Sequence, residues 1–285
     1  MAHFHLWSVV FVTFVAFVPF TSPHKKLTFS ENRLNFHETT MNIYPIGTNM
    51  LKVIAFDLDG TLTQHKTPLD DQNRRALEVL SKKYTLLMVG AGQVMRIFNQ
   101  MGGFPIDIIG NYGLQFGKYN HATKQMDIVR DLTLPCDRES VAQRIEQLRV
   151  KYGFTQYAGD SVEYHPSGCV TFPLIGTKAK QEDKLAFDPT REKRRKFYDD
   201  VVKTFSDYVV FIGGSSSFDF APKPYDKRYA LDLYCKENGL THDELAYCGD
   251  DYGLGGNDEA VYKSDFKFIC VDDYRTFPHK IAELL

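Results

Sequence analysis

The sequence lacks an excess of either charge and lacks closely spaced cysteines. Its 34 lysines and arginines against 36 aspartates and glutamates give a formal net charge of -2 at pH 7, so no global attraction to nucleic acid or to an anionic membrane is expected. The five cysteines are far apart and form no C-x-x-C motif, which argues against a disulfide framework or a zinc site and is typical of a reducing compartment. The length of 285 residues allows one large globular domain or two smaller ones.

The apolar run near the N-terminus is too short for a membrane span. It covers residues 6–20, whereas a span needs roughly 20 residues. Its length fits a signal peptide, but no Lys or Arg precedes it and no clear small-x-small cleavage site follows. Three interpretations of residues 1–49 stay open: a mis-assigned start, a genuine signal or anchor, and an ordered extension. We expect the folded part to begin near Met50 and to need no membrane. The expected location is the cytoplasm, or, if the signal is genuine, the protein is exported or anchored.

Strands that alternate with helices predict an α/β domain built from both ends of the chain. Continuous apolar runs at 51–56 and 85–89 are typical of parallel strands that are buried on both faces. The alternation predicts a doubly wound parallel sheet. The other elements expected in this domain are helices at 70–82, 93–101, 226–238 and 257–263, and strands at 106–109, 244–248 and 266–271.

The middle of the chain has a different pattern, in which strands follow one another and helices are fewer. This pattern predicts an α+β lobe that is inserted into the α/β domain as a cap. We place the core at residues 50–131 and 224–285 and the cap at 132–223. The elements expected in the middle are a hairpin at 115–129, helices at 138–152 and 191–206, alternating strands over 161–172, and a strand pair at 208–212 and 217–220.

Two aspartates directly follow the first predicted strand. Asp57 and Asp59 occur in the string D-L-D-G-T-L-T, and ligands bind at the carboxyl ends of parallel strands. One carboxylate can attack phosphorus or bind Mg²⁺, and the other can protonate a leaving oxygen. Gly60 permits a sharp turn whose amides can hold phosphate oxygens. A solvated turn is the alternative, but the full string favours a phosphoryl-transfer site with Asp57 as the nucleophile.

A second acidic cluster follows the strand predicted at 244–248. Asp250 lies at its carboxyl end, where it can complete a site for a hard cation together with Asp57. Oxygen ligands without histidine favour magnesium over zinc. Lys227, at the start of the preceding helix, can offset the carboxylates and bind the transferring phosphate. Taken singly, an Asp/Gly-rich turn and an exposed helix lysine are the alternatives, and only the combination with Asp57 favours a catalytic site.

These strings resemble the motifs of the haloacid dehalogenase superfamily. D-L-D-G-T-L-T is similar to its nucleophile motif, G-D at 249–250 to its distal acid motif, and the inserted lobe to the larger α/β cap of its sugar-phosphate branch. Within the superfamily, residues 50–285 most resemble the eukaryotic-type phosphomannomutases. The strings that carry this resemblance are N-Y-G-L (111–114), G-G-S-S-S-F-D-F (213–220), Y-D-K-R-Y (225–229) and G-D-D-Y-G-L-G-G-N-D (249–258), the last with the mutase-like spacing of six residues between Asp250 and Asn257.

The resemblance implies a role for each matching residue. Asp57 would form the aspartyl-phosphate, Asp59 would act as general acid and base, and Lys227 would bind the phosphoryl group. Magnesium would be the cofactor, held by Asp57, the backbone carbonyl of Asp59 and Asp250, with Asp258 as a further candidate ligand. The partner would be a small phosphorylated metabolite, in particular a sugar phosphate, and two copies could pair through their caps. The substrate would be contacted by Gly90, Ala91, Gly92, Ser217, Asp219 and Lys66, the last standing roughly where the mutases have arginine.

The sequence departs from the family pattern in two places. The loop V-G-A-G-Q at 89–93 has no Ser or Thr hydroxyl for the phosphate, and removal of one transition-state donor can cost roughly 10²–10³ in rate. The cap stretch at 158–178 has no arginine for a second phosphate, and its basic residues are His165 and Lys178. The predicted helix that follows is basic at 191–196, either as a solvated face or with one side chain that reaches over the cleft to a phosphate.

These departures decide how we rank three possible functions. A phosphatase needs one phosphate site, whereas a mutase must bind phosphate at both ends of its substrate. The missing cap arginines therefore favour a magnesium-dependent phosphatase that hydrolyses a sugar phosphate or similar small phosphomonoester through aspartyl-phosphate. A phosphomannomutase-like phosphohexomutase is the first alternative. A sugar-phosphate-binding protein with little turnover, motivated by Gly92, is the second.

Overall fold

The structure is a computed structural model that describes residues 51–285. Residues 1–49, for which the sequence leaves three interpretations open, lie outside the described residues, and so does the prediction of export or anchoring. In the described part of the chain, no helix has both the length and the apolar character that crossing a membrane requires.

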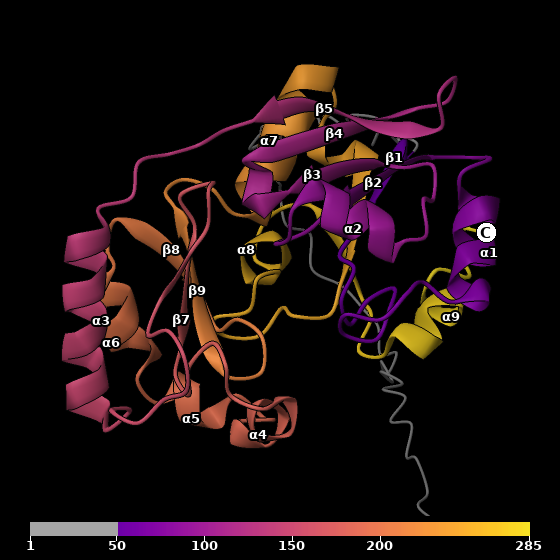
Figure 1. The fold of residues 1–285 in the computed structure, drawn as a ribbon. Coiled ribbons are helices and arrows are strands. Elements are labelled where there is room, and N and C mark those ends of the chain that lie inside the picture. The colour runs from indigo at the N-terminus through magenta and orange to yellow at the C-terminus, as the bar shows by residue number, and fades with distance from the viewer. Residues whose placement is uncertain (1–50) are drawn as a thin grey trace, which may run out of the picture. The chain divides into compact units, whose positions relative to one another are not determined.

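A seven-stranded sheet forms the core (Figure 1). Its strands are β1 (Val53–Phe56), β2 (Thr85–Val89), β3 (Asp107–Gly110), β4 (Gln115–Asn120), β5 (Gln125–Asp131), β10 (Leu245–Gly249) and β11 (Lys267–Cys270). They lie in the order β11-β10-β1-β2-β3-β4-β5. The first five in this order are parallel, and β4 and β5 continue the sheet as an antiparallel hairpin. The predicted α/β class with a parallel central sheet is confirmed.

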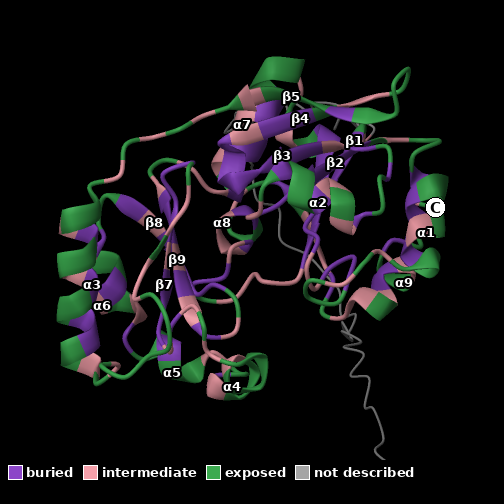
Figure 2. Cartoon of the chain, viewed as in Figure 1, coloured by how far each residue is buried: buried purple, intermediate pink, exposed green. Residues whose placement is uncertain are grey.

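Helices cover both faces of the core sheet, which explains the continuous apolar runs of its central strands. Successive side chains of β1 point to opposite faces, so that Ile54 and Phe56 pack into one buried cluster and Val53 and Ala55 into another. Figure 2 shows these strands as buried and the outer sides of the helices as exposed. The first cluster holds α1 (Asp71–Leu80), α2 (Val94–Gln100) and α9 (Phe277–Lys280), and the second holds α7 (Lys227–Asn238) and α8 (Glu259–Tyr262).

A second sheet has four antiparallel strands, β6 (Glu163–Tyr164), β7 (Val170–Pro173), β8 (Tyr208–Phe211) and β9 (Ser217–Pro222), in the order β6-β7-β9-β8. Phe218 and Phe220 of β9 pack beside α3 (Arg138–Tyr152) and α6 (Tyr198–Thr204). This sheet and its helices match the expected α+β cap, although the boundaries at 131/132 and 223/224 stay a prediction. The remaining helices are α4 (Gln181–Phe187), α5 (Glu192–Arg195) and the 3₁₀ segments Asn111–Gly113, His242–Glu244 and Tyr274–Thr276.

Three helical segments differ from what the sequence predicts. The single helix expected over 191–206 is wrong, because the structure has α5 and α6 with a break between them. The break includes Phe197, whose ring stacks on Tyr152 and meets the edge of Phe218, so burial of this ring takes precedence over helix continuity. The sequence also does not predict α4 and α9, which are too short to show an amphipathic repeat.

Candidate active site

The residues assigned to chemistry meet at one edge of the core sheet. Asp57 and Asp59 follow β1, the loop at 90–92 follows β2, and Asp250 follows β10. These three strands are parallel neighbours. Their carboxyl ends open into a cavity of about 770 Å³ that the cap sheet also lines. A cavity of this size is typical of a binding site for a small molecule.

Lys227, the first residue of α7, is completely buried next to the aspartates. Its ammonium group donates hydrogen bonds to Asp57 Oδ1 at 2.6 Å, Asp258 Oδ1 at 2.7 Å and Asn257 Oδ1 at 2.8 Å. Burial lowers the pKa of Lys227, but Asp258 and Asp57 outweigh this effect and hold the pKa above its ordinary value. Lys227 therefore stays charged within the site, and the alternative of an exposed helix lysine is excluded.

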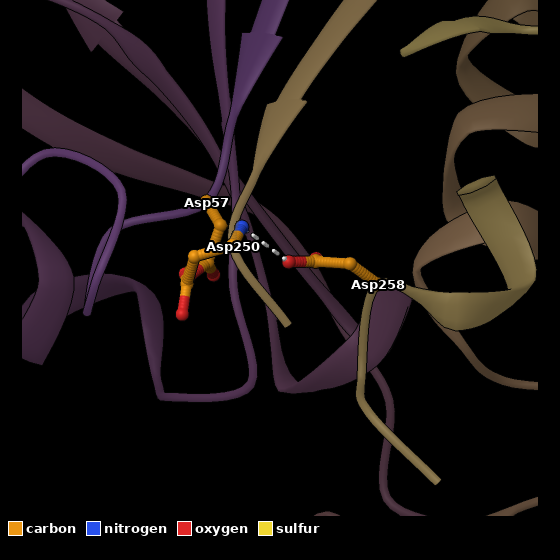
Figure 3. Close-up of side chains that lie close together, drawn as sticks. All are labelled: Asp57, Asp250 and Asp258. Atoms are coloured by element: carbon orange, nitrogen blue, oxygen red, sulfur yellow. Dashed lines mark hydrogen bonds between the residues drawn. The ribbon is translucent and has the colours of Figure 1, made fainter. Parts of the chain in front are cut away.

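Asp258 is a buried anchor whose two carboxylate oxygens already accept hydrogen bonds. Oδ1 accepts from Lys227 and, at 2.6 Å, from the Tyr247 hydroxyl. Oδ2 accepts from the backbone N–H groups of Asp250 at 3.1 Å and Asp251 at 3.0 Å, the first of which Figure 3 shows. Four donors use the lone-pair positions of a carboxylate. The metal-ligand role of Asp258 stays a prediction, while these contacts show that it holds Lys227 and the turn at Asp250.

Asp57, Asp250 and Asp258 form a cluster suited to a metal ion (Figure 3), with one oxygen of each within 4.8 Å of the others. Burial, followed by the charge of Asp258, raises the pKa of Asp250 to about 6, and burial raises the pKa of Asp57 well above its ordinary value. Three carboxylates share the one positive charge of Lys227, so a divalent cation would offset the remainder. The Oδ2 atoms of Asp57 and Asp250 accept no hydrogen bond from the described residues, and oxygen ligands suit Mg²⁺.

This fit to magnesium can be measured without a substrate. We expect Mg²⁺ to raise the melting temperature of the wild-type protein by several degrees, since binding at about 100 times Kd contributes about 2.7 kcal/mol. Asp250→Asn should remove most of this shift, and without metal it should be at least as stable as wild type because it removes a charge that burial disfavours. Asp251→Asn, at the neighbouring residue outside the cluster, is the control and should keep the shift. An undiminished shift in Asp250→Asn would contradict the assignment.

Asp59 lies close to Asp57 in sequence, but its carboxylate is outside this cluster. Its Oδ1 accepts hydrogen bonds from the backbone N–H of Lys66 and from Gln100 Nε2, both at 2.7 Å. The side chain is 19% exposed and lines the cavity, where it can exchange a proton with a leaving or attacking oxygen. Metal coordination by its backbone carbonyl stays a prediction. Gln100 is a site residue that the sequence does not reveal, because a glutamine at a helix end carries no distinguishing pattern.

The loop at 90–92 offers backbone donors to the cavity that it lines. Within residues 51–285, the N–H groups of Ala91 and Gly92 have no hydrogen-bond acceptor. The carbonyl of Gly92 accepts the N–H of Asn111 at 2.9 Å, which holds the loop in place. Ala91 and Gly92 therefore have backbone donors available for the predicted substrate contacts, whereas the N–H of Gly90 already donates to the carbonyl of Ile109 at 2.9 Å. The loop presents no side-chain hydroxyl.

The cap sheet presents polar side chains to the cavity. Asp219 accepts a 2.9 Å hydrogen bond from Thr171 Oγ1, and that oxygen lies 3.0 Å from His165 Nε2. Because the single hydroxyl proton of Thr171 goes to Asp219, His165 Nε2 must donate to Thr171. Ser217 and Glu163 line the same wall, whereas no lysine or arginine in the described strands of the cap sheet does. The wall of the cavity that the cap sheet forms is therefore a hydrogen-bonding surface with two carboxyl groups, those of Glu163 and Asp219.

Two arginines of the basic segment at 191–196 line the cavity, and both already have partners in the protein. Arg194 also lines the cavity, but it is buried, pairs with Asp188 at 2.9 Å and donates to the carbonyl of Ser217, so it supports the cap. Arg191 lines the cavity and donates a hydrogen bond to Asp251 of the core. A wholly solvated face is therefore wrong for these two arginines, and contact of either with a phosphate stays a prediction.

The fold and the site define a protein of the haloacid dehalogenase type, and solved structures share this fold. They include an IMP-nucleotidase of Plasmodium falciparum, with a TM-score of 0.61 and 15% sequence identity, covering 83% of this chain and 68% of that one. Another is a haloacid dehalogenase-like hydrolase of B. subtilis, with a TM-score of 0.56 and 15% identity, covering 82% of this chain and 100% of that one.

More narrowly, the chain belongs to the eukaryotic phosphomannomutase family, whose profile matches residues 74–274. Its relatives include a phosphomannomutase of Saccharomyces cerevisiae, 24% identical over 240 residues that cover 80% of this chain and 88% of the relative. A phosphomannomutase of Encephalitozoon cuniculi is 26% identical over 220 residues that cover 74% and 84%, respectively. The resemblance found in the motifs is confirmed, as is the prediction that the chain is an enzyme of this superfamily.

Proposed function

We propose that the chain is a magnesium-dependent, phosphohexomutase-like enzyme that transfers the phosphoryl group of a sugar phosphate to Asp57 and returns it to a hydroxyl of the sugar. The observation that carries the proposal is the 2.6 Å pairing of Asp57 with the buried ammonium group of Lys227 at the edge of the cavity. The relatives are named phosphomannomutases. The family match supports return of the phosphate to the sugar more than hydrolysis, which reverses the order that the sequence alone suggests.

Two half-reactions follow from the positions of the carboxylates. In the first, an oxygen of Asp57 attacks phosphorus, the bond from phosphorus to the sugar oxygen breaks, and Asp59 gives its proton to that oxygen. In the second, a sugar hydroxyl attacks the phosphorus of the aspartyl-phosphate, Asp59 takes the hydroxyl proton, and Asp57 leaves as a carboxylate. Lys227 offsets the charge beside Asp57 in both steps. Mg²⁺ held by Asp57 and Asp250 would neutralise charge on the phosphoryl oxygens.

The second candidate is hydrolysis, in which water replaces the sugar hydroxyl in the second half-reaction. The cap sheet gives a specific reason to keep it. A mutase reaction through a bisphosphate needs positive charge at the end of the cavity far from Asp57. The strands of the cap sheet that line the cavity carry Glu163 and Asp219, and like charges in this wall disfavour a second phosphate. Two cap cations line the cavity, but Arg191 donates to Asp251 of the core and Arg194 pairs with Asp188. A monophosphate substrate avoids this conflict.

One assay separates the two candidates. The purified protein is given hexose 1-phosphates and 6-phosphates with Mg²⁺, with and without a hexose bisphosphate. We expect interconversion of the two phosphates that depends on the bisphosphate. Release of inorganic phosphate without interconversion would place water ahead of the sugar as the acceptor. Saturable binding without either product would instead favour the binding-protein alternative and would overturn the proposal of turnover.

A further inference from the structure

Gly92 lies in the loop that has no hydroxyl, and its backbone conformation does not require a glycine. Its φ lies outside the left-handed region in which glycine is favoured. A Cβ added at this position would lie 2.2 Å from Nη2, 2.3 Å from Nε and 2.6 Å from Cζ of Arg96. The space that a side chain at position 92 would take is therefore occupied by the guanidinium group of Arg96.

Arg96, in α2, has polar partners on one side of its guanidinium group and free donors on the other. Nη1 donates to Gln100 Oε1 at 2.7 Å and lies 3.6 Å from Asp59 Oδ2. Nε and Nη2 have no acceptor in the described part of the chain, and these two atoms are the nearest to Gly92. The side chain is 43% exposed and lines the cavity. Two donors therefore remain available to a ligand.

These free donors lie beside the loop and near the acid that a transferring phosphoryl group must contact. The group must contact the nucleophile Asp57, the loop at 90–92, and the acid Asp59. Arg96 contacts the loop and approaches Asp59 within the same cavity. The planar fork of arginine binds two phosphate oxygens with parallel hydrogen bonds and keeps its charge, whereas a loop hydroxyl would donate one neutral hydrogen bond.

We propose that Arg96 replaces the missing loop hydroxyl and donates its Nε–H and Nη2–H to oxygens of the transferring phosphoryl group, and that Gly92 makes room for it. The inference rests on the proposed transfer through Asp57 but not on whether the sugar or water finally takes the phosphate. It makes Arg96 a catalytic residue, because its donors contact the reacting group. The ligand is the phosphoryl part of any phosphomonoester, so the contact does not depend on the sugar.

Arg96 Nη1 lies 3.6 Å from Asp59 Oδ2. This distance suggests a different role for Arg96, in which it does not contact the phosphoryl group and only orients the acid Asp59. The two roles differ in their dependence on the leaving group. An alkyl ester such as a sugar phosphate needs a proton from Asp59 as it leaves, whereas 4-nitrophenolate is stable without one. Loss of Arg96 should slow both kinds of ester alike if it binds the phosphoryl group, and should slow only alkyl esters if it acts through Asp59.

The variants Arg96→Ala and Gly92→Ser, singly and together, test the proposal with 4-nitrophenyl phosphate and Mg²⁺. We expect kcat/KM to fall about 10²–10³-fold in Arg96→Ala, as for other donors to a transition state. Gly92→Ser added to Arg96→Ala should recover about tenfold, because the serine hydroxyl then has the space that the arginine left. Arg75→Ala, which changes an exposed arginine of α1, is the matched control and should equal wild type.

Beryllium fluoride, which mimics a phosphoryl group on an aspartate, gives a second measurement that needs no turnover. With Mg²⁺ it should raise the melting temperature of wild type, and Arg96→Ala should lose most of that gain. The absence of any gain in wild type would count against Asp57 and so against the proposed function itself. A full gain in Arg96→Ala, a rate within about threefold of wild type, or slowing confined to alkyl esters would each overturn the role of Arg96 alone.

Discussion

We expect Asp57→Asn to abolish phosphoryl transfer while the protein stays folded. Asparagine keeps an oxygen that can accept the hydrogen bond from Lys227, which is 2.6 Å long in the wild-type protein, but its amide cannot become an aspartyl-phosphate. Loss of the nucleophile of a serine protease costs about 10⁶ in kcat, so we expect a loss of at least about 10³ here. Stability should not fall, because burial already raises the pKa of Asp57 and disfavours its charge.

Rapid quenching followed by mass spectrometry measures the intermediate of this reaction directly. Wild type mixed with 4-nitrophenyl phosphate should carry a phosphoryl group on the peptide that contains residues 53–63, and Asp57→Asn should not. Asp59→Asn is the control two residues away. It should still be phosphorylated, since this leaving group needs no acid, but it should turn over sugar phosphates slowly. Full activity in Asp57→Asn, or a phosphoryl group on a different peptide, would refute the assignment of the nucleophile.

The core and its carboxylates could be predicted because their signals are local. The continuous apolar run before Asp57 is typical of a strand that is buried on both faces of a sheet, and the aspartate follows this strand directly. The acidic turn after β10 has the same relation to its own strand. Once both strands are placed in one parallel sheet, their carboxyl ends must lie at the same edge, so the proximity of Asp57 and Asp250 follows from topology.

The side-chain contacts that complete the site could not be predicted in this way. From the sequence, the loop at 90–92 shows only a lost hydroxyl, and the arginine that fills the space at Gly92 lies in the next helix. The sequence shows no arginine over 158–178 and leaves open whether the basic segment at 191–196 is solvated or reaches the cleft, and only the structure places Arg191 at the cavity. In each case the chemistry depends on which side chains converge. That convergence is decided by packing, which a residue's sequence neighbours do not determine.

The burial of Lys227 also depends on packing, and we expect its substitution to have the second large effect. Lys227→Met should destabilise the protein, because the ammonium group pairs with Asp57 at 2.6 Å and Asp258 at 2.7 Å and is completely buried. Removal of one partner from a buried ion pair costs about 3–5 kcal/mol, since the remaining charge has no compensation. Urea unfolding without Mg²⁺ measures this loss. Lys236→Met, at an exposed position of α7, should change the free energy of unfolding by less than about 0.5 kcal/mol.

Stability and activity should separate in the double variant Lys227→Met/Asp258→Asn. Neutralising Asp258 removes one of the two carboxylate charges that Lys227→Met leaves without a partner, so the double variant should be more stable than Lys227→Met, and a double-mutant cycle measures this coupling. The rate should not recover, because Asp57 still lacks the ammonium group that offsets charge during transfer. A lysine with a purely structural role predicts the opposite, a rate that returns with stability. Restored stability with a lost rate would therefore assign Lys227 to the chemistry of Asp57 as well as to the fold.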